Sequence, residues 1–537
     1  MKLSLEGIKN RGEWEAKGYS LPSFDIETVK KSTLENPFWI HFGAGNIFRA
    51  FQANVVQELL NKGVLDRGLV VAEGYDYEII EKMYRPHDNI GALVTLKSSG
   101  SVEKTVVGSI MEALCADSSN EKDWARLLEI FRSPSLQMVT FTITEKGYLL
   151  KNASGVFMPG VEDDFNAGPV LPKSYIGKVV TLLHERFVNG ELPVAMVSMD
   201  NCSHNGDKLY AAVNEFASEW EKRGVCKSGF LKYINDESKV TFPWTMIDKI
   251  TPRPDAKIEQ ILKDDGIEEL EPVITTKKTY VAPFVNAEEC QYLVIEDKFP
   301  NGRPELEKAG LYFTNRETVD KVEKMKVCTC LNPLHTFLAI SGNLLGYTLI
   351  ADEMKDEDLL RLVKRLGYEE GLPVVVDPGI IKPRDFIDEV VNIRIPNPFM
   401  PDTPQRIACD TSQKLSIRFG ETIKKYLENK SLSLDNLKVI PLVFALWLRY
   451  LMALDDNGNV FELNPDPLLD DVKKYVEGVK LGEGVSDESL TKIDELLRRK
   501  EIFGVDLFEA GLAPRVKDLF KELIKEKGSV RRVLQSI

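Results

Sequence analysis

Three polar side chains of different chemistry lie close together in the chain: Lys326, Asn332 and His335. The segment that begins at Lys326 predicts a short buried strand or turn leading into an apolar helix. Asn332 suits the N-cap of that helix, because its side-chain oxygen can accept a free backbone N–H, and Pro333 suits the next position. The positive end of a helix dipole favours a neutral imidazole and a developing anion. These residue types can move a proton and stabilise an alkoxide, but the segment alone is more typical of a capped core helix with a surface lysine.

Composition narrows the kind of protein that positions these residues. The chain has 537 residues, 43% of them hydrophobic, with a formal net charge of −14. This length supports more than one domain, and the negative charge argues against binding to nucleic acid or membrane surfaces. An anionic substrate would therefore need a local pocket of Arg or Lys. The seven scattered cysteines fit no zinc pattern and favour a reducing, cytoplasmic setting, so we expect no metal site.

No targeting or membrane segment is expected. The N-terminus lacks the apolar stretch of a signal peptide. The most apolar run, residues 440–454, is shorter than the roughly 20 residues that a membrane span needs and contains Arg449. It predicts a buried helix.

A strand, a glycine turn and a helix are predicted in succession near the N-terminus. The apolar run Phe38 to Phe42 indicates the strand, and apolar residues at helical spacing follow the turn. Gly43 permits a tight turn, and Gly45 lets a pyrophosphate approach the backbone at the helix start. Phe48 stands where the third glycine of the usual dinucleotide motif would be. The candidate cofactor-binding residues of this loop are Gly43, Ala44, Gly45, Asn46, Ile47 and Arg49.

An acidic residue ends the second predicted strand, residues 69–73. Glu73 stands there and Asp76 follows closely. A carboxylate at this place typically holds the ribose hydroxyls of NAD and repels the 2′-phosphate of NADP. A solvated strand end fits Glu73 equally well. The acidic residue favours NAD as the cofactor, although it lies somewhat further along the chain than the usual spacing of about 20 residues.

Two further buried strands, residues 136–143 and 194–199, are each followed by polar residues. Ligands of open α/β sheets bind beyond the carboxyl ends of the strands. Thr144, Glu145 and Asp200 are therefore candidate cofactor-binding residues, and Asn201 is a further candidate of this edge.

Strands that alternate with helices predict an α/β fold with a Rossmann-type, mostly parallel sheet over residues 1–300. The breaker cluster Phe299 to Pro304 marks the expected domain boundary. Helical patterns then predict a mainly α-helical domain over residues 301–537. Within it, Arg394 suits bidentate binding of a carboxylate and Lys414 adds a point charge, although both also suit ordinary ion pairs.

Taken in order, these motifs resemble the polyol-specific long-chain dehydrogenase family, which includes mannitol dehydrogenases and hexuronate reductases. The resemblance spans nearly the whole chain. It rests on segments that include Gly43-x-Gly45-Asn-x-x-Arg49, Thr144-Glu-Lys-Gly-Tyr148, Asp200-Asn201, Phe242-Pro-x-Thr-Met-x-Asp248, Glu323-x-x-Lys326, Asn332-x-x-His335, Arg394-x-x-Asn-Pro398 and Asp410-x-Ser-x-Lys414.

The resemblance implies a role for each matching residue. Lys326 would be the general acid/base, and Asn201 with Asn332 would form the oxyanion hole. His335 would orient the substrate, and Glu323 would lie on the proton path to the lysine. The implied substrate-binding residues are Asp248, Arg394 and Lys414.

The activity implied is NAD-dependent hydride transfer between D-fructuronate and D-mannonate, without a metal, by a monomer or small homo-oligomer acting on a small sugar acid. Alternatives are tagaturonate, an uncharged ketose such as fructose, an epimerase that retains NAD, or a nucleotide sensor without catalysis. The chain departs from the family pattern at Met199 and Trp244. It also has five residues between Lys326 and Asn332 where the family usually has four, so we expect a bulge before the helix.

Overall fold

The computed structural model describes all 537 residues. Contacts divide the chain into two compact units: residues 1–97 with 101–320, and residues 98–100 with 321–537. The first unit extends beyond the breaker cluster at which the boundary is expected. The reason is that β15 (Tyr312–Thr314) pairs in parallel with β14 (Tyr292–Glu296) and so continues a sheet of the first unit.

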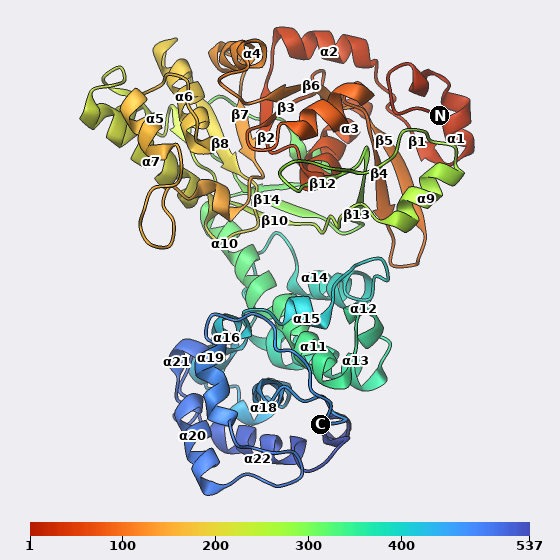
Figure 1. The fold of residues 1–537 in the computed structure, drawn as a ribbon, viewed down its shortest axis with the longest axis vertical. Helices are drawn as coiled ribbons and strands as arrows, with labels where there is room; N and C mark the ends of the chain where they lie inside the picture. Colours follow the sequence, from red (N-terminus) through yellow and green to blue (C-terminus); the bar gives the residue numbers. More distant parts are fainter. The chain divides into compact units, whose positions relative to one another are not determined.

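A six-stranded parallel sheet forms the centre of the first unit (Figure 1). Its strand order is β6-β3-β2-β7-β8-β9, and every neighbouring pair is parallel. This is the order typical of dinucleotide-binding folds, with its switch point between β2 and β7. The predicted Rossmann-type sheet is thus confirmed. The strands are β2 (Trp39–Phe42), β3 (Leu69–Glu73), β6 (Ile110–Cys115), β7 (Met138–Phe141), β8 (Val194–Ser198) and β9 (Val240–Thr241).

Alternate residues of these strands enter two separate hydrophobic cores. Trp39 and Val71 belong to the core that contains Phe48, Phe51 and α3 (Ala53–Asn61). Ile40 and Val70 belong to the core that contains the side chains of α4, α6 and α7. Helices therefore cover both faces of the sheet, which explains why β2 is buried along its whole length. These covering helices are α4 (Glu121–Arg132), α6 (Tyr175–Val188) and α7 (Asn205–Arg223).

Three smaller sheets complete the first unit. In the first, ordered β1-β5-β4-β13, β4 and β5 form an antiparallel pair. In the second, ordered β10-β14-β15, β10 pairs antiparallel with β14, and the third consists of the antiparallel pair β11 and β12. The remaining strands are β1 (Tyr19–Ser20), β4 (Gly91–Leu96), β5 (Val102–Val107), β10 (Thr245–Asp248), β11 (Val273–Ile274), β12 (Tyr280–Val281) and β13 (Phe284–Glu288), and the remaining helices are α1 (Arg11–Ala16), α2 (Ile26–Glu35), α5 (Val161–Ala167), α8 (Phe230–Ile234) and α9 (Ala256–Asp264).

The second unit is helical, as expected. All 13 residues of α18 (Val439–Leu451) are buried, so the most apolar run of the chain is a core helix. The carboxylate of Glu370 accepts hydrogen bonds from the first backbone N–H groups of α18 at 2.6–2.9 Å. The other helices are α10 (Arg316–Met325), which begins in the first unit, and α11 (Asn332–Leu345), α12 (Ile350–Glu353), α13 (Glu357–Lys364), α14 (Pro383–Glu389), α15 (Pro404–Ile407), α16 (Thr411–Leu415), α17 (Glu421–Glu428), α19 (Leu469–Val472), α20 (Asp487–Leu497), α21 (Lys500–Phe503), α22 (Ala513–Leu523) and α23 (Ser529–Ser536).

Several of these helices contain a π-helical turn, in which one extra residue is inserted into the α-helical ladder. Such turns follow α10, α13 and α14 and lie between α16 and α17. They span Lys326–Cys330, Arg365–Gly371, Val390–Arg394 and Ser416–Gly420, and two more in the first unit span Phe48–Gln52 and Ile80–Tyr84.

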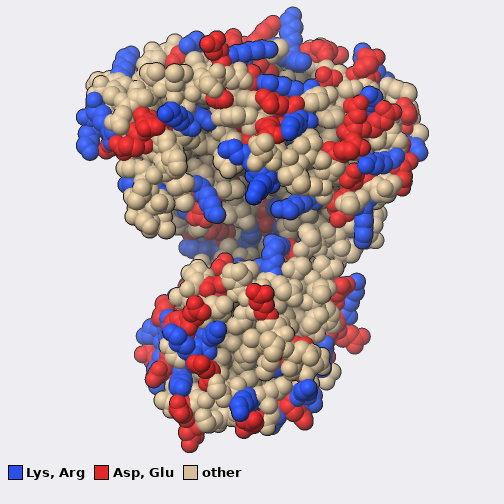
Figure 2. All heavy atoms as spheres, in the orientation of Figure 1, with Lys and Arg blue, Asp and Glu red and all other residues tan.

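Charge is distributed without a large patch of one sign on the visible faces, where basic and acidic side chains intermix over each unit (Figure 2). None of the helices combines the length and hydropathy that crossing a bilayer requires.

Candidate active site

A cavity of about 890 Å³ lies within the first unit, at the carboxyl ends of β2, β3 and β7. Its wall includes Gly43, Gly45, Glu73 and Thr144, all of which are candidates from the sequence. A neighbouring pocket of about 320 Å³ shares Thr142 and Thr144 with it and adds Asp200 and Asn201. The structure therefore brings six candidate residues to one edge of the sheet: Gly43, Gly45, Glu73, Thr144, Asp200 and Asn201. Dinucleotides bind at this edge in folds with this strand order.

The glycine loop fits an approaching diphosphate. Gly43 has φ +111°, and a Cβ there would lie 2.3 Å from the carbonyl oxygen of Thr142, so another residue could not take its place. A Cβ at Gly45 would meet nothing within 4 Å, because that side of the residue opens onto the cavity. Gly43 thus permits the turn, whereas Gly45 leaves room for a ligand.

Glu73 holds the loop rather than presenting a free carboxylate. One oxygen accepts from the backbone N–H of Ala44 at 2.9 Å. The other accepts from the N–H groups of Tyr75 and Asp76 at 2.8 and 3.2 Å. Burial raises the pKa of Glu73, while these three hydrogen bonds oppose the rise. The carboxylate expected to hold the ribose is therefore already engaged by the backbone.

Asp76 is the better-placed carboxylate. It is 3% exposed and lines the cavity. One oxygen accepts a hydrogen bond from the Thr275 hydroxyl at 2.6 Å, whereas the other, Oδ1, is buried without a partner. A buried acceptor without a donor costs free energy, and a ribose hydroxyl would supply that donor. The donor set of the cavity therefore fits NAD.

Asp200 fixes the loop that follows β7. Its two oxygens accept from the backbone N–H groups of Ile143 and Thr144 at 3.0 and 2.9 Å, and Tyr148 donates its hydroxyl to Asp200 as well. Thr144 has φ +65°, which is strained for a β-branched residue and persists only where neighbours enforce it. The hydrogen bonds to Asp200 hold Thr144 in this conformation, and Asp200 thereby shapes the cavity wall.

A buried chain of hydrogen bonds leads from β2 to the same wall. Trp39 donates its indole N–H to the Thr140 hydroxyl at 2.7 Å, and the ring nitrogens of His41 lie 2.6 Å from Thr140 and 2.8 Å from Thr142. Because Nδ1 is the only acceptor within reach of the Thr140 proton, Nε2 carries the hydrogen and donates to Thr142. Burial lowers the pKa of His41 to about 3, so the ring is neutral. The Thr142 hydroxyl can then donate into the cavity.

Phe48 explains the missing third glycine. Its ring stacks on His41, with centroids 4.4 Å apart and planes inclined by 13°. It lies in the π-helical turn Phe48–Gln52, directly after the glycine loop. In the usual motif the third glycine permits close packing of helix on strand. Here the stacked ring occupies that place.

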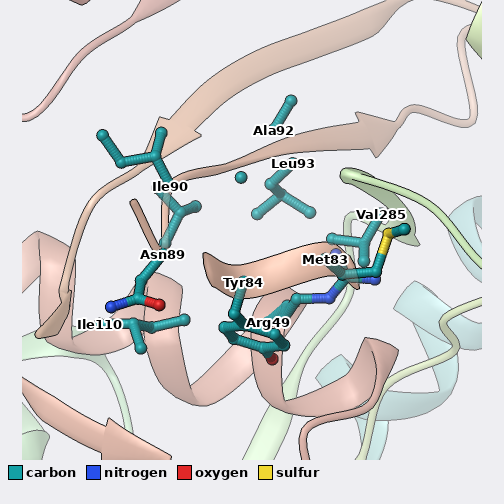
Figure 3. A pocket seen from close by; sticks show the side chains of 11 residues that line it. Arg49, Met83, Tyr84, Asn89, Ile90, Ala92, Leu93, Ile110 and Val285 are labelled. Carbon is teal, nitrogen blue, oxygen red and sulfur yellow. The ribbon is translucent and has the colours of Figure 1, made fainter. Parts of the chain in front are cut away.

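Arg49 points away from the cavity, despite its place in the loop motif. Its guanidinium donates to the Ala282 carbonyl at 2.7 Å and to the Asn46 side chain at 3.1 Å. Figure 3 shows it beside Tyr84, in the wall of a separate cavity of only about 20 Å³. Arg49 and Asn46 therefore brace the loop from behind, and Ala44 is fully buried. Ile47 lines the 320 Å³ pocket.

The remaining candidates of the first unit differ in exposure. Asn201 is exposed and lines the 320 Å³ pocket. Glu145 lines it as well and forms an ion pair with Lys208 at the surface. Asp248 is 5% exposed and ends β10.

In the second unit, Lys326 opens the π-helical turn Lys326–Cys330 and is 5% exposed. The backbone N–H of Leu331 donates to the Lys326 carbonyl at 3.1 Å, the i→i+5 bond of such a turn. The expected bulge is thus confirmed, while the expectation of a strand or turn is wrong. Helical geometry continues from α10 because the insertion widens the ladder instead of breaking it.

Asn332 is the first residue of α11, and Leu331 occupies the N-cap. The N-cap prediction for Asn332 is therefore wrong, because the π-helical turn brings the chain into the helix one residue earlier. The Asn332 side chain forms no hydrogen bond within the chain, so its amide N–H groups are available to a ligand. Glu323 lies one turn before Lys326 on α10 and is half-buried.

His335 lies in the first turn of α11, beside a carboxylate. Its Nε2 is 3.7 Å from Asp402, which also pairs with Arg406. Burial lowers the pKa of His335 to about 4; Asp402 opposes this shift, and Arg394 and Arg418 add to it. The imidazole is consequently neutral near pH 7, as expected at a helix start.

Lys414 is committed to the backbone. It donates to the carbonyls of Cys409 and Ile407, and burial lowers its pKa. Arg394 is 4% exposed at the end of its π-helical turn. Arg418, one turn after Lys414, was not expected from the sequence; its spacing of four residues from Lys414 on one helix is the signal that would indicate it.

Thr142 and Asp76 line the cavity and His41 hydrogen-bonds to Thr142, although the motifs assigned none of the three a role there. Period-2 alternation along residues 38–42 places His41 on the face opposite Phe42, but the pattern does not identify its partners. Only the pairing of β2 with β7 brings it beside Thr140 and Thr142.

Both units match one family of enzymes. Residues 38–308 match the mannitol dehydrogenase Rossmann domain, and residues 318–524 match the mannitol dehydrogenase C-terminal domain. The chain therefore belongs to the mannitol dehydrogenase family, and it is an NAD-type dehydrogenase that acts on a CH–OH group.

Individual relatives cover the whole chain. A D-mannonate oxidoreductase of Thermotoga maritima is 52% identical over 539 residues, which cover 100% of this chain and 99% of the relative. A crystal structure of D-sorbitol dehydrogenase has a TM-score of 0.77 at 26% identity and covers 96% of this chain and 97% of its own. The ternary complex of Pseudomonas fluorescens mannitol 2-dehydrogenase with NAD and D-mannitol has a TM-score of 0.69 at 26% identity and covers 100% and 99%.

Proposed function

We propose that the chain interconverts D-fructuronate and D-mannonate with NAD as the hydride carrier. The observation that carries this proposal is the end-to-end similarity to a D-mannonate oxidoreductase at 52% identity. The cavity of the first unit supports the cofactor, because Asp76 has an unpaired acceptor for ribose and Gly45 leaves space for the diphosphate. The P. fluorescens relative was solved with NAD.

We assign proton transfer to Lys326. When bound, the nicotinamide cofactor supplies the hydride in one direction and accepts it in the other. In the reduction, the Lys326 ammonium gives a proton to the oxygen of the carbon that is reduced. In the oxidation, neutral Lys326 takes the proton of the alcohol. Burial of Lys326 keeps this exchange away from bulk water.

Two amides are assigned to the developing negative charge. The free side-chain N–H groups of Asn332 suit an oxyanion, and Asn201 is the second proposed donor. Loss of one such donor commonly costs about 3–4 kcal/mol in the transition state. Neutral His335 is proposed to orient a substrate hydroxyl, with Asp402 holding the ring. Glu323 is proposed to pass protons to Lys326, and Asp248 and Arg394 to bind the substrate.

The substrate is tested by following NADH absorbance with purified protein and D-fructuronate, tagaturonate or fructose in parallel. We expect rapid oxidation of NADH with fructuronate. Preference for fructose would instead assign the chain to the neutral polyol branch, which the D-sorbitol and mannitol dehydrogenase structures represent. Preference for tagaturonate would change the sugar acid and keep the chemistry.

The assignment of Lys326 is tested by Lys326→Ala. We expect kcat to fall by at least about 100-fold, the usual contribution of a positioned acid or base, while the affinity for NADH is retained. Lys364→Ala is the matched control, because Lys364 is an exposed lysine of α13. Near-normal turnover of Lys326→Ala would remove Lys326 from the mechanism.

A further inference from the structure

Arg418 is a half-buried arginine without an acidic partner. It lies in the π-helical turn Ser416–Gly420, and burial alone lowers its pKa to about 10. Its single hydrogen bond runs from Nη1 to the hydroxyl of Thr336, the residue after His335. No carboxylate forms an ion pair with it. A guanidinium that is partly removed from water is stabilised by an anionic partner, which this chain does not provide.

Buried and half-buried arginines elsewhere in the chain have acceptors for their guanidinium groups. Arg186 donates to four backbone carbonyls at 2.7–3.2 Å. Arg449 donates to the carbonyls of Leu454 and Asp455. Arg126 is held by Glu112. Arg418 has none of these arrangements, so its unused donors distinguish it from a structural arginine.

Asp402, the carboxylate beside His335, already pairs with Arg406. Its other oxygen lies 3.7 Å from Nε2 of His335. Asp466, in the same helical region, receives both hydrogen bonds from Ser412. The positive charge of Arg418 therefore remains uncompensated, and it lies close enough to His335 to lower the pKa of that imidazole.

One edge of the Arg418 guanidinium has no hydrogen-bond acceptor within the chain. Nη1 donates to the Thr336 hydroxyl, whereas Nε and Nη2 have no acceptor. These two N–H groups form the side of the fork that binds a carboxylate through two parallel hydrogen bonds. Lys414 is less suited to this role, because two of the three N–H groups of its ammonium already bond to the carbonyls of Cys409 and Ile407 and it has no fork geometry.

We propose that Arg418 binds the carboxylate of the substrate and thereby selects a sugar acid over the corresponding neutral polyol. This inference rests on the proposed function. It assigns to Arg418 the bidentate carboxylate binding that the sequence suggested for Arg394, and Arg394 remains a proposed substrate-binding residue. Thr336 acts as a positioning residue, since its hydroxyl holds the guanidinium one residue away from His335.

The test compares two ligands that differ only at the carboxylate. D-Mannonate and D-mannitol are titrated calorimetrically into the NAD-saturated enzyme, with wild type, Arg418→Met and Arg418→Lys. We expect wild type to prefer D-mannonate, and Arg418→Met to lose roughly 100-fold or more in D-mannonate affinity while D-mannitol affinity changes less than about threefold. Arg418→Lys should recover part of the loss, because charge returns without the fork. Arg384→Met, at an exposed arginine of α14, is the control.

Equal losses for both ligands, or a preference for D-mannonate that persists in Arg418→Met, would overturn the proposal. So would a wild type that binds the two ligands equally. A wild type that prefers D-mannonate through Arg418 but does not oxidise it with NAD would refute the proposed function and leave the binding assignment intact. Thermal melting of each variant identifies a loss that comes from unfolding.

Discussion

At the scale of single residues, the carboxylates of the nucleotide cavity divide into two kinds. Glu73 and Asp200 accept backbone N–H groups and hold loops in shape. Asp76 keeps one oxygen without a donor. The sequence indicates that an acidic residue follows β3, but it does not indicate which of two neighbours is already bonded. That distinction depends on how Gly74 and Tyr75 turn the backbone, which no spacing rule provides.

We expect Asp76 to contribute to the preference for NAD over NADP, because its unpaired oxygen lies at the cavity wall. We expect Asp76→Asn to weaken NADH binding and to reduce the preference for NADH over NADPH by about tenfold, because a neutral amide no longer repels a 2′-phosphate. Fluorescence titrations with both nucleotides measure this ratio. Asp66→Asn, at a largely exposed aspartate, is the control. An unchanged ratio would show that another group discriminates between the cofactors.

At the scale of elements, long periodic patterns were predicted well and local irregularities were not. The strands predicted at residues 69–73 and 194–199 are β3 and β8, and they follow directly from runs of apolar residues. The extra residue before α11 was recognised as a bulge only through spacing. Its form as a π-helical turn depends on hydrogen bonds that leave no signature in residue type. Arg418 was missed for the same reason, since its lack of a partner is a property of packing.

The turn Lys326–Cys330 sets the direction of Lys326 relative to α11. Deletion of Cys328 would restore α-helical hydrogen bonding and rotate Lys326 by about 100°. We expect turnover to fall by at least about 100-fold while helical circular dichroism is retained. Cys328→Ala, which keeps the length, should leave turnover near that of wild type. Turnover of the deletion variant close to wild type would show that the extra residue has no role in catalysis.

At the scale of the whole molecule, each unit is organised around its own interior. The first unit has two hydrophobic cores on opposite faces of its sheet, and the second surrounds the buried helix α18. The architecture of both follows from the sequence, because alternation of strands and helices defines one and uninterrupted helical periodicity defines the other. The division between them follows less directly, since β15 extends the first unit past the breaker cluster.

The cofactor should therefore stabilise the two units unequally. All of the cavity's walls belong to the first unit, so a ligand there adds binding free energy to that unit, about 2.7 kcal/mol at 100 times the Kd. We expect saturating NAD to slow amide exchange in β2, β3 and β7 more than in α18. Hydrogen exchange followed by mass spectrometry makes this comparison. Equal protection of α18 and the sheet would contradict it.

The π-helical turns have a consequence for how relatives of this chain are recognised. A helix that absorbs one extra residue keeps its neighbours packed, so the distance along the chain between two functional residues can change without loss of the fold. A search pattern that fixes four residues between the lysine and the asparagine would pass over this sequence, where five stand between Lys326 and Asn332. Alignments of such enzymes should allow a gap at each π-helical turn, and a single-residue length difference there is no sign of a degenerate site.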